Sequence, residues 1–397
     1  MKKQDGFGGM TFSRYCCICM YLLKRLSLSI AAVILLFSCK DEVTNPKKGT
    51  DFTVDSIGVQ LDTLITGLNR PWGIEFIEGN QILITERTGK LYLWNGSDLQ
   101  TVSGLPTEIK ATGQGGLLDV RKHPNYETNK LIYFCGSAGS SAAISTTLYR
   151  GELNNNSLTK VEKLFEATPK NTSGAHFGSR IVFDENGFVY LSLGERNNLT
   201  SAQDKSNHNG SVIRINDDGT VPSSNPFYNE ANSQKEIFTY GHRNVQGMTV
   251  HPLTAEIWTH EHGPQGGDEI NILRAGNNYG WPIATYGINY NGDTISKDTH
   301  VAGTVLPIYY WVPSIAPCGM DFYHSDSIPQ WKGDLFLGAL AGKHLNHLTI
   351  ENNSVVKEER LLQGLARFRS VRQGPDGYLY FTTEGPGMLM RFRPKVD

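Results

Sequence analysis

Polar side chains and glycines are concentrated in one stretch of the chain, residues 240–281, which reads YGHRNVQGMTVHPLTAEIWTHEHGPQGGDEINILRAGNNYGW. Glycine lets backbone groups approach a ligand closely, and loops on a rigid scaffold are where binding sites occur. The stretch therefore predicts a ligand site, with a polar turn region between two strands as the alternative. Its polar residues include Arg243, Asn244, Gln246, His260, Glu261, His262, Asp268, Glu269, Asn277 and Asn278.

Oxygen ligands suited to Ca²⁺ occur within this stretch. Glu269 and Tyr279 bracket a turn rich in glycine and asparagine. Gly263 and Pro264 offer two further backbone carbonyls, since proline carries an acceptor and no donor. Ca²⁺ takes about six to eight hard oxygen ligands, whereas no His or Cys cluster here has zinc spacing. We therefore expect a Ca²⁺ site, with a solvated acidic loop as the alternative.

A histidine with a carboxylate partner could act as a general base. His176 lies between small residues in SGAHFGSRIVFDENG, directly ahead of an expected strand. Glu195, at the far end of the same hairpin, could accept the Nδ1 proton and fix the tautomer. A structural histidine is the alternative. Gln114 is a glycine-flanked amide in ATGQGGLLDV, which a simple turn would also explain.

Three cations fall close together near the end of the chain. They are Lys343 in LAGKHL and Arg367 and Arg369 in LARFRSVRQG. Because side chains alternate along a strand, Arg367 and Arg369 are expected on one strand face. Three convergent cations would bind a polyanionic ligand. The alternative is a set of exposed strand charges.

A recurring phrase shows which elements must position these residues. Each copy is a turn with Asn, Asp or Gly, followed by a strand of alternating aromatic and branched residues and then by a second apolar strand. After the N-terminal region no long segment has the helical period. The six copies are GNQILITER (79–87), TNKLIYFCG (128–136), ENGFVYLSLGE (185–195), LTAEIWTHEHG (253–263), WKGDLFLGAL (331–340) and PDGYLYFTTEG (375–385).

Six strand-rich units without helices predict an all-β, six-bladed β-propeller, in which each blade is a small antiparallel sheet and closure of the ring removes exposed edges. A pair of β-sandwiches is the alternative, but it predicts no repeat. We expect the strand at 54–65 to complete the last blade together with C-terminal strands.

Composition excludes several classes of partner. Charged residues make up 19% of the chain and the net charge is -2, so the chain has neither a basic field for nucleic acid nor an acidic tail. The 17 tyrosines, 17 phenylalanines and 42 glycines are typical of a protein rich in strands and turns.

The N-terminus has the pattern of an export signal over residues 1–39. Lys24 and Arg25 precede an apolar run, 26–37, and the ending LLFSC resembles a bacterial lipobox. Cys39 would then be the lipidated first residue of the mature protein, and the only link to a membrane. An uncleaved anchor is the alternative.

Residues 40–51 are expected to form a polar tether, and residues 52–397 the propeller. Met20 is a plausible start of translation, which would remove three of the six cysteines. Beyond Cys39 only Cys135 and Cys318 remain. They could form one disulfide, but their apolar surroundings favour two buried thiols.

Taken together, these phrases resemble the soluble sugar dehydrogenases that use pyrroloquinoline quinone (PQQ), particularly the aldose sugar dehydrogenase branch. The resemblance covers nearly all of the chain after the N-terminal region, and the GHRNxQG and GPxGGDEIN phrases are highly specific. The matching runs are LNRPWGIEF, GQGGLLDVRKHP, GAHFGSRIVFDENGFVYLSLGER, GSVIRINDDGTVPSSNPF, YGHRNVQGM, EHGPQGGDEINILRAGNNYGWP and LARFRSVRQGPDGYLYFTTE.

The resemblance implies a six-bladed propeller with PQQ across one end of its central channel. In that arrangement His176 would be the base that removes the C1 hydroxyl proton of an aldose, and Glu195 would hold it, where the family often has Asp. Arg243 would lie against the quinone oxygens. The further contacts that the resemblance assigns to the cofactor are Gln114, Asn244, Gln246, Lys343, Arg367 and Arg369.

The resemblance also implies two Ca²⁺ ions. The carbonyls of Gly263 and Pro264 would help to hold one at the quinone, and Glu269 and Tyr279 would bind a second, structural ion. The stretch YYWVPSIAPCG (309–319) only approximates the family pattern, and it places Trp311 and Ser314 as cofactor neighbours.

The sequence thus predicts an exported, PQQ- and Ca²⁺-dependent dehydrogenase that oxidises aldoses to lactones and passes electrons to an external acceptor. One rival is a Ca²⁺-dependent propeller hydrolase such as a lactonase, which would not need the three cations. The other is a non-catalytic binding propeller at the cell surface, against which the intact set of His176, Gln114 and Arg243 argues.

Overall fold

The computed structural model describes residues 50–54, 57–140 and 142–395, with side chains from residue 57 onward. These residues belong to one compact unit, Asn45–Asp397. The predicted export signal at 1–39, including Cys39, and most of the tether at 40–51 lie outside the described residues.

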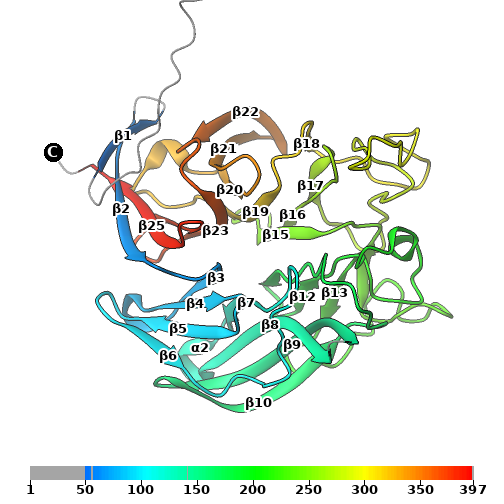
Figure 1. Cartoon of the computed structure of the whole chain (residues 1–397), viewed down its shortest axis with the longest axis horizontal. Coiled ribbons are helices and arrows are strands. Elements are labelled where there is room, and N and C mark those ends of the chain that lie inside the picture. Colours follow the sequence, from blue (N-terminus) through cyan, green and yellow to red (C-terminus); the bar gives the residue numbers. More distant parts are fainter. Residues whose placement is uncertain (1–49, 55–56, 141, 396–397) are drawn as a thin grey trace, which may run out of the picture. The chain divides into compact units, whose positions relative to one another are not determined.

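Six antiparallel sheets are arranged as the blades of a β-propeller, as the sequence predicts (Figure 1). Blade 1 contains β3 (Pro71–Phe76), β4 (Ile82–Glu86), β5 (Lys90–Trp94) and β6 (Leu99–Val102). Blade 2 contains β7 (Leu117–Lys122), β8 (Leu131–Ser140), β9 (Ala143–Asn154) and β10 (Ser157–Glu166). Blade 3 contains β11 (Ile181–Phe183), β12 (Val189–Ser192), β13 (Ser211–Ile215) and β14 (Ile237–Tyr240).

The second half of the ring repeats this order. Blade 4 contains β15 (Val245–Val250), β16 (Ile257–Glu261), β17 (Asp268–Ile272) and β18 (Tyr309–Trp311). Blade 5 contains β19 (Pro317–Phe322), β20 (Leu335–Ala339), β21 (His344–Glu351) and β22 (Ser354–Leu361). Blade 6 contains β23 (Arg367–Gln373), β24 (Leu379–Glu384), β25 (Met388–Pro394), β2 (Ile57–Thr66) and β1 (Thr50–Val54).

Helical structure in the described part is limited to α2 (Tyr126–Asn129) and to short 3-10 turns at Glu78–Asn80, Leu199–Gln203 and Pro329–Trp331. None of these helices has the length or the apolar character needed to cross a membrane.

The recurring phrase of the sequence is the second strand of every blade. In blade 3 its turn is built by Asp184, whose carboxylate accepts the backbone N–H groups of Asn186 and Phe188. Gly187 completes this turn at a φ of 82°, which residues with a Cβ rarely adopt. Such local turns fix the hairpin register, so one short phrase can specify each blade.

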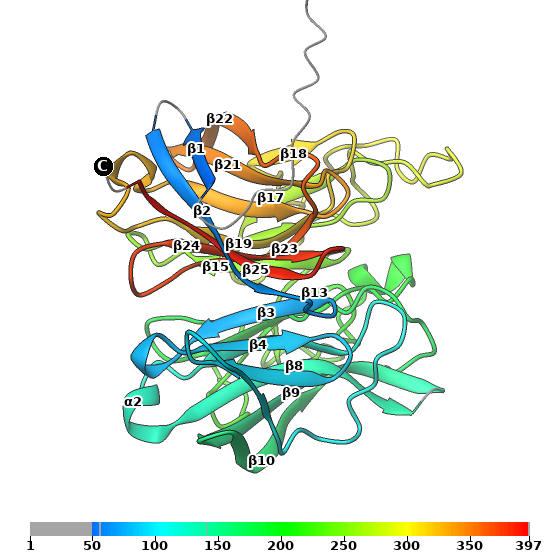
Figure 2. The same cartoon turned by 60° about the vertical axis from the view of Figure 1, so that its left-hand side comes forward.

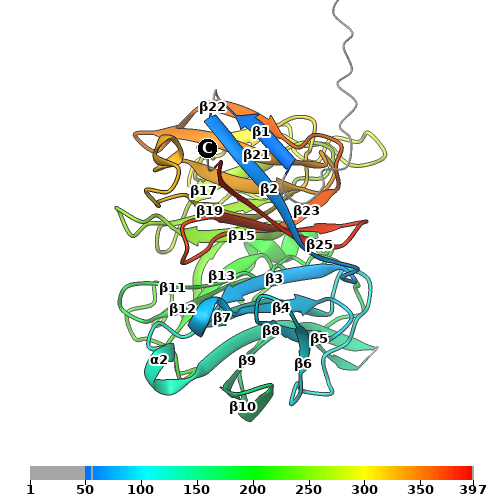
Figure 3. The same ribbon diagram turned by 90° about the vertical axis from the view of Figure 1, so that its left-hand side faces the viewer.

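The ring is closed by strands from the two ends of the described chain. β2 pairs antiparallel with β25, with Leu61 opposite Phe392 and Val59 opposite Pro394. Figures 2 and 3 show β2, in blue, beside β25, in red. The expected closing strand at 54–65 is therefore confirmed, with bounds of Ile57–Thr66.

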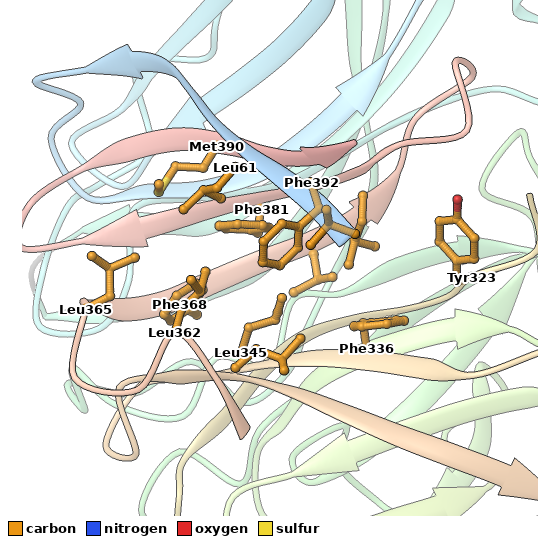
Figure 4. Close-up of a cluster of buried hydrophobic side chains, with 14 of the residues drawn as sticks. Leu61, Tyr323, Phe336, Leu345, Leu362, Leu365, Phe368, Phe381, Met390 and Phe392 are labelled. Atoms are coloured by element: carbon orange, nitrogen blue, oxygen red, sulfur yellow. The ribbon is translucent and has the colours of Figure 1, made fainter. Parts of the chain in front are cut away.

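Hydrophobic side chains hold each blade to the next. The described residues form six buried clusters, one at each junction between neighbouring blades. Figure 4 shows the cluster between blades 5 and 6, where Phe336 and Leu345 face Phe368, Phe381 and Phe392. Burial of these surfaces is the main stabilising term of the ring.

One buried guanidinium connects the innermost strands. The first strand of each blade contacts the first strands of its two neighbours, and Arg180 directly precedes β11 in this inner ring. Arg180 is 1% exposed and contacts the other five blades. Its partners are the Trp72 ring (3.8 Å), Asp119 Oδ1 (3.5 Å), the Gln246 carbonyl (2.8 Å), Cys318 Sγ (3.5 Å) and the Arg369 carbonyl (3.0 Å).

Further ion pairs lie along the inner ring, near the C-terminal ends of its strands. Arg372 donates to Glu75 at 3.1 Å across the junction of blades 6 and 1. Arg121 pairs with Asp119 at 2.9 Å within blade 2 and lies 3.9 Å from Glu75. The charges of these buried groups are thus balanced within the ring.

Both cysteines of the described part are free and buried, in agreement with the expectation of two thiols. The Cys135 thiol donates to the Ser179 carbonyl at 2.9 Å, and burial raises the pKa of Cys135. Cys318 belongs to the group around Arg180.

Arg180→Met is expected to lower the free energy of unfolding by about 3 to 5 kcal/mol, because it leaves the buried Asp119 carboxylate without one cation and two carbonyls without a donor. Chemical denaturation measures this loss. Arg360→Met, at an exposed pair with Glu358, is the control and should cost less than about 1 kcal/mol. Equal losses in the two variants would show that Arg180 does not hold the ring together.

Candidate functional site

A cavity of about 210 Å³ opens where the innermost strands begin. It brings together Gln114, Asn244, Gln246, Arg367 and Arg369, which the sequence predicts as cofactor contacts. The remaining lining residues are Trp72, Arg87, Leu118, Phe177, Gly178, His262, Ala316 and Leu340.

The predicted base and its partner form a direct pair beside this cavity. His176 Nδ1 lies 2.5 Å from Glu195 Oε2, and the His176 backbone N–H donates to Gln114 Oε1 at 2.9 Å. When Nδ1–H donates a hydrogen bond to Glu195, the neutral imidazole keeps the Nε2 lone pair free. The Glu195 side chain therefore reaches the histidine.

The loop that carries His176 has an unusual backbone. His176 adopts a φ of 52°, and a Cβ added to Gly194 would lie 2.2 Å from the His176 carbonyl. Glycine is therefore required at 194, next to Glu195, for the carboxylate strand to approach the histidine loop.

Arg196 supports this loop from behind. Its guanidinium donates to the carbonyls of Ser173 and Ala175 and to Asn171 Oδ1 at 3.2 Å, and it stacks 3.6 Å from the Phe177 ring. Burial lowers the pKa of Arg196 to about 10. A buried cation whose N–H groups donate hydrogen bonds to one loop constrains the conformation of that loop.

The two predicted amides tie blade 4 to blade 3. Asn244 Oδ1 accepts the Gly178 backbone N–H at 3.1 Å, and Gln246 Nε2 donates to the Gly178 carbonyl at 2.9 Å. The other end of Gln246 accepts Arg369 Nη1 at 3.4 Å. The amides therefore fix the wall between the histidine loop and the arginines.

The basic wall differs in detail from the sequence expectation. Arg367 and Arg369 both line the cavity, but a β-bulge at Phe368–Ser370 breaks simple alternation, so Arg369 is buried while Arg367 is exposed. Glu384 pairs with Arg369 at 2.8 Å, and although burial opposes this, Arg369 holds the pKa of Glu384 below its usual value. The Lys343 side chain is exposed and outside the lining.

Arg243 stands at the boundary of a second, smaller cavity. It donates to the carbonyls of His262 (3.1 Å) and Gly263 (3.0 Å) and lies over the Trp281 ring at 5.4 Å. Its own carbonyl accepts the Glu195 N–H at 2.9 Å, which places it next to the histidine pair.

The second cavity contains a buried pair of acids. Glu261 and Glu269 are opposite each other across β16 and β17, and Tyr279 lines the same space. Glu269 accepts one long hydrogen bond, 3.5 Å from Asn271, and its pKa is raised by burial and by Glu261. A cation would offset this uncompensated charge. No group of three or more His, Cys, Asp or Glu side chains converges as a metal site among the described residues.

Asp268 binds two further predicted residues, Gly263 and Ser314. Its carboxylate accepts the N–H groups of Gly263 (2.8 Å), Ile315 (2.7 Å) and Ala316 (2.9 Å) and the Ser314 hydroxyl (2.7 Å). Ser314 therefore acts on the cavity through Asp268 and through Ala316, which lines it.

Trp311 is not brought to the cavity. Its indole N–H donates to Glu358 Oε2 at 3.3 Å, on the outer strand β22 of the next blade. The strand alternation of Tyr309–Trp311 directs both of these rings to Glu358.

A repeated carboxylate links the blades to the site. In three blades Glu is the last residue of the second strand, and in blade 3 it follows that strand after two residues; each time it binds a residue at the start of the same blade. These pairs are Glu86 with Asn69, Glu195 with His176, Glu261 with His242, and Glu384 with Arg369. Sequence reasoning found only the pair of Glu195 with His176, although the recurring phrase contains all four glutamates.

Comparison with known proteins bears on what this cavity does. The glucose/sorbosone dehydrogenase family model matches residues 68–391. The chain belongs to the glucose/sorbosone dehydrogenase family. The match covers all six blades, so the resemblance seen in the sequence is confirmed.

Relatives of this dehydrogenase agree over most of its length. Aldose sugar dehydrogenase YliI of Escherichia coli (strain K12) is 42% identical over 347 residues, or 85% of this chain and 93% of the relative. Quinoprotein glucose dehydrogenase B of Acinetobacter calcoaceticus is 30% identical over 67% of this chain and 61% of the relative. The crystal structure of the soluble aldose sugar dehydrogenase of E. coli in the apo form superimposes with a TM-score of 0.81 at 40% identity, covering 85% of this chain and all of that one.

In this dehydrogenase, Arg196→Met should release the histidine loop. Amide hydrogen exchange at residues 171–176 is expected to accelerate at least about tenfold, because the loop carbonyls lose their donor. Mass spectrometry measures the exchange. The matched control is Arg214→Met, in the same blade, whose guanidinium binds Asn225 instead. Unchanged exchange in Arg196→Met would remove the supporting role.

Proposed function

We propose that this enzyme is a PQQ-dependent aldose dehydrogenase that oxidises the C1 hydroxyl of a sugar to a lactone and passes electrons to an external acceptor. The observation that carries the proposal is that three amides and a basic wall line one cavity, with the His176–Glu195 pair beside it. The relative named as a quinoprotein supports the choice of cofactor.

The residues at the cavity fit PQQ. The cofactor is a tricarboxylate, and the wall offers Arg367 and Arg369 against the single carboxylate of Glu384. Gln114, Asn244 and Gln246 add amide groups. Arg243 would face the quinone oxygens, where negative charge develops.

Bound PQQ would supply the electrophilic carbonyl carbon that accepts the hydride from C1. The chain's own task is to take the hydroxyl proton. His176 Nε2 is available for that proton because Nδ1 is held by Glu195. Glu195 then stabilises the imidazolium at 2.5 Å, and its backbone N–H holds it to Arg243.

Two Ca²⁺ sites accompany this proposal. The Gly263 carbonyl accepts Arg243 at 3.0 Å and keeps a second lone pair, which with the Pro264 carbonyl would serve an ion beside the cofactor. The buried Glu269, with Tyr279, would hold a second, structural ion. We also propose export, with residues 1–39 as the signal and Cys39 as a lipid anchor.

His176→Ala is expected to reduce aldose oxidation by about 10²- to 10⁴-fold, since it removes the base. The assay combines apo-protein, PQQ and Ca²⁺ with several aldoses and an artificial electron acceptor. His300→Ala, at an exposed histidine, is the control and should retain full activity.

Three results would contradict the proposal in different ways. Full activity of His176→Ala would remove the base. A wild-type protein that takes up no PQQ would indicate a non-catalytic binding propeller. Lactone hydrolysis that needs Ca²⁺ but not PQQ would indicate a propeller hydrolase.

Glu269→Gln is expected to raise the unfolding midpoint of the Ca²⁺-free protein and to abolish its further rise with Ca²⁺. Burial and Glu261 raise the pKa of Glu269, so its ionised form destabilises the ion-free state at neutral pH. Thermal unfolding in chelator and in millimolar Ca²⁺ measures both effects, with the exposed Glu185→Gln as control. A Ca²⁺-induced rise of wild-type size in Glu269→Gln would rule out this ligand.

A further inference from the structure

Arg87 lines the cavity from blade 1, whereas the predicted arginines line it from blade 6. It follows β4 directly and is half-buried. One of its terminal nitrogens donates to the Gly113 carbonyl, next to Gln114. Its Nε–H is buried and has no acceptor among the residues that the structure describes. A guanidinium carries five N–H donors in a fixed fork, so one carbonyl leaves most of that fork unused.

The charges around Arg87 are unbalanced. Arg70, Arg367 and Arg369 act on it as like charges, and Glu384 is the carboxylate that opposes them. Burial first, and then Arg369, lower the pKa of Arg87. The whole chain has a net charge of -2, so this positive excess is local. Three cations that line one cavity, Arg87, Arg367 and Arg369, around the single carboxylate of Glu384 indicate a site that an anion completes.

The structural guanidiniums of this molecule are more fully bonded. Arg180 bonds through Nε to the Gln246 carbonyl and through Nη2 to the Arg369 carbonyl, and it pairs with Asp119. Arg196, whose Nε–H is also unpaired, donates through its terminal nitrogens to Asn171, Ser173 and Ala175. Among the described residues no carboxylate forms an ion pair with Arg87, and the neighbouring Glu86 accepts from Asn69 and Thr88. Support of the Gly113 turn accounts for one end of the side chain and leaves the cavity side unexplained.

We propose that Arg87 is an additional anchor for the anionic cofactor, binding one of its carboxylates with the unused side of the guanidinium fork. The inference rests on the proposed function. The carboxylates of PQQ are spread around a rigid ring system, so anchors on a single wall cannot meet all of them. Arg87 would contribute a charged contact to a carboxylate from blade 1, as Arg367 and Arg369 would from blade 6.

Isothermal titration calorimetry of the apo-protein with PQQ tests this proposal directly and without turnover. Arg87→Gln is expected to weaken binding at least about tenfold at low salt, as for loss of a charge-assisted hydrogen bond. Arg70→Gln is the matched control, because it removes the same charge from an exposed side chain that does not line the cavity. It should change the affinity less than about threefold.

The salt dependence and a conservative variant separate anchoring from support of the Gly113 turn. Arg87→Lys should keep most of the affinity, and Arg87→Gln should show a shallower loss of affinity with added NaCl than the wild type. Equal affinity of Arg87→Gln and wild type would overturn the inference. So would Arg87→Lys binding as weakly as Arg87→Gln with an unchanged salt dependence, since Arg87 would then act only through the turn.

Failure of the underlying function is recognised separately. A wild-type protein that binds no PQQ contradicts the proposed function itself. Circular dichroism of each variant confirms the fold before titration, and if Arg87→Gln does not fold, the comparison of Arg87→Lys with wild type over the same salt series decides. A loss of affinity in Arg87→Lys that salt does not alter would then count against the anchor.

Discussion

The buried Arg180 guanidinium is the constraint on which the rest of the structure depends. It gathers an aromatic ring, a carboxylate, a thiol and two backbone carbonyls from the other five blades at the centre of the ring. Three of these partners, Trp72, Gln246 and Arg369, also line the cavity. The position of the site and the closure of the propeller are thus set by the same contacts. A buried charge is expensive unless fully paired, so this arrangement tolerates few alternative packings.

The candidate site is an elaboration of a feature that the blades share. In four of them a glutamate at the end of the second strand binds a residue at the start of the same blade. In blade 1 it only braces the backbone of Asn69, whereas in blade 3 the same geometry orients His176. In blade 4 it holds His242, which stacks on Tyr279 beside the acid pair. One repeated contact therefore holds a loop backbone in blade 1, the candidate base in blade 3 and a histidine beside the acid pair in blade 4.

The fold was largely predictable because turn chemistry and strand alternation are local properties, and all six copies of the phrase are the second strands of blades. The site was predictable where residues lie in specific motifs, as for His176, Gln114 and Gln246. Arg87 was missed because its proposed role depends on arginines that lie near it in space but belong to another blade, blade 6. The bulge at Phe368–Ser370 and the turn of Trp311 toward Glu358 depend on packing between strands that alternation alone does not specify. Lys343 was expected among the anchors, yet its position outside the lining reflects the loop that carries it.

The pairing of β2 with β25 has a consequence for how this molecule is made. Synthesis delivers β2 before the other five blades and β25 after them, so the edge of β2 that pairs with β25 waits without its partner until those blades have been made. An unpaired edge strand readily adds to other sheets, which makes this interval the one most exposed to wrong association. The inner contacts of Arg180 also need both halves of the ring. Completion of the cavity, which Arg367 and Arg369 of blade 6 line, therefore waits for the blade that is made last.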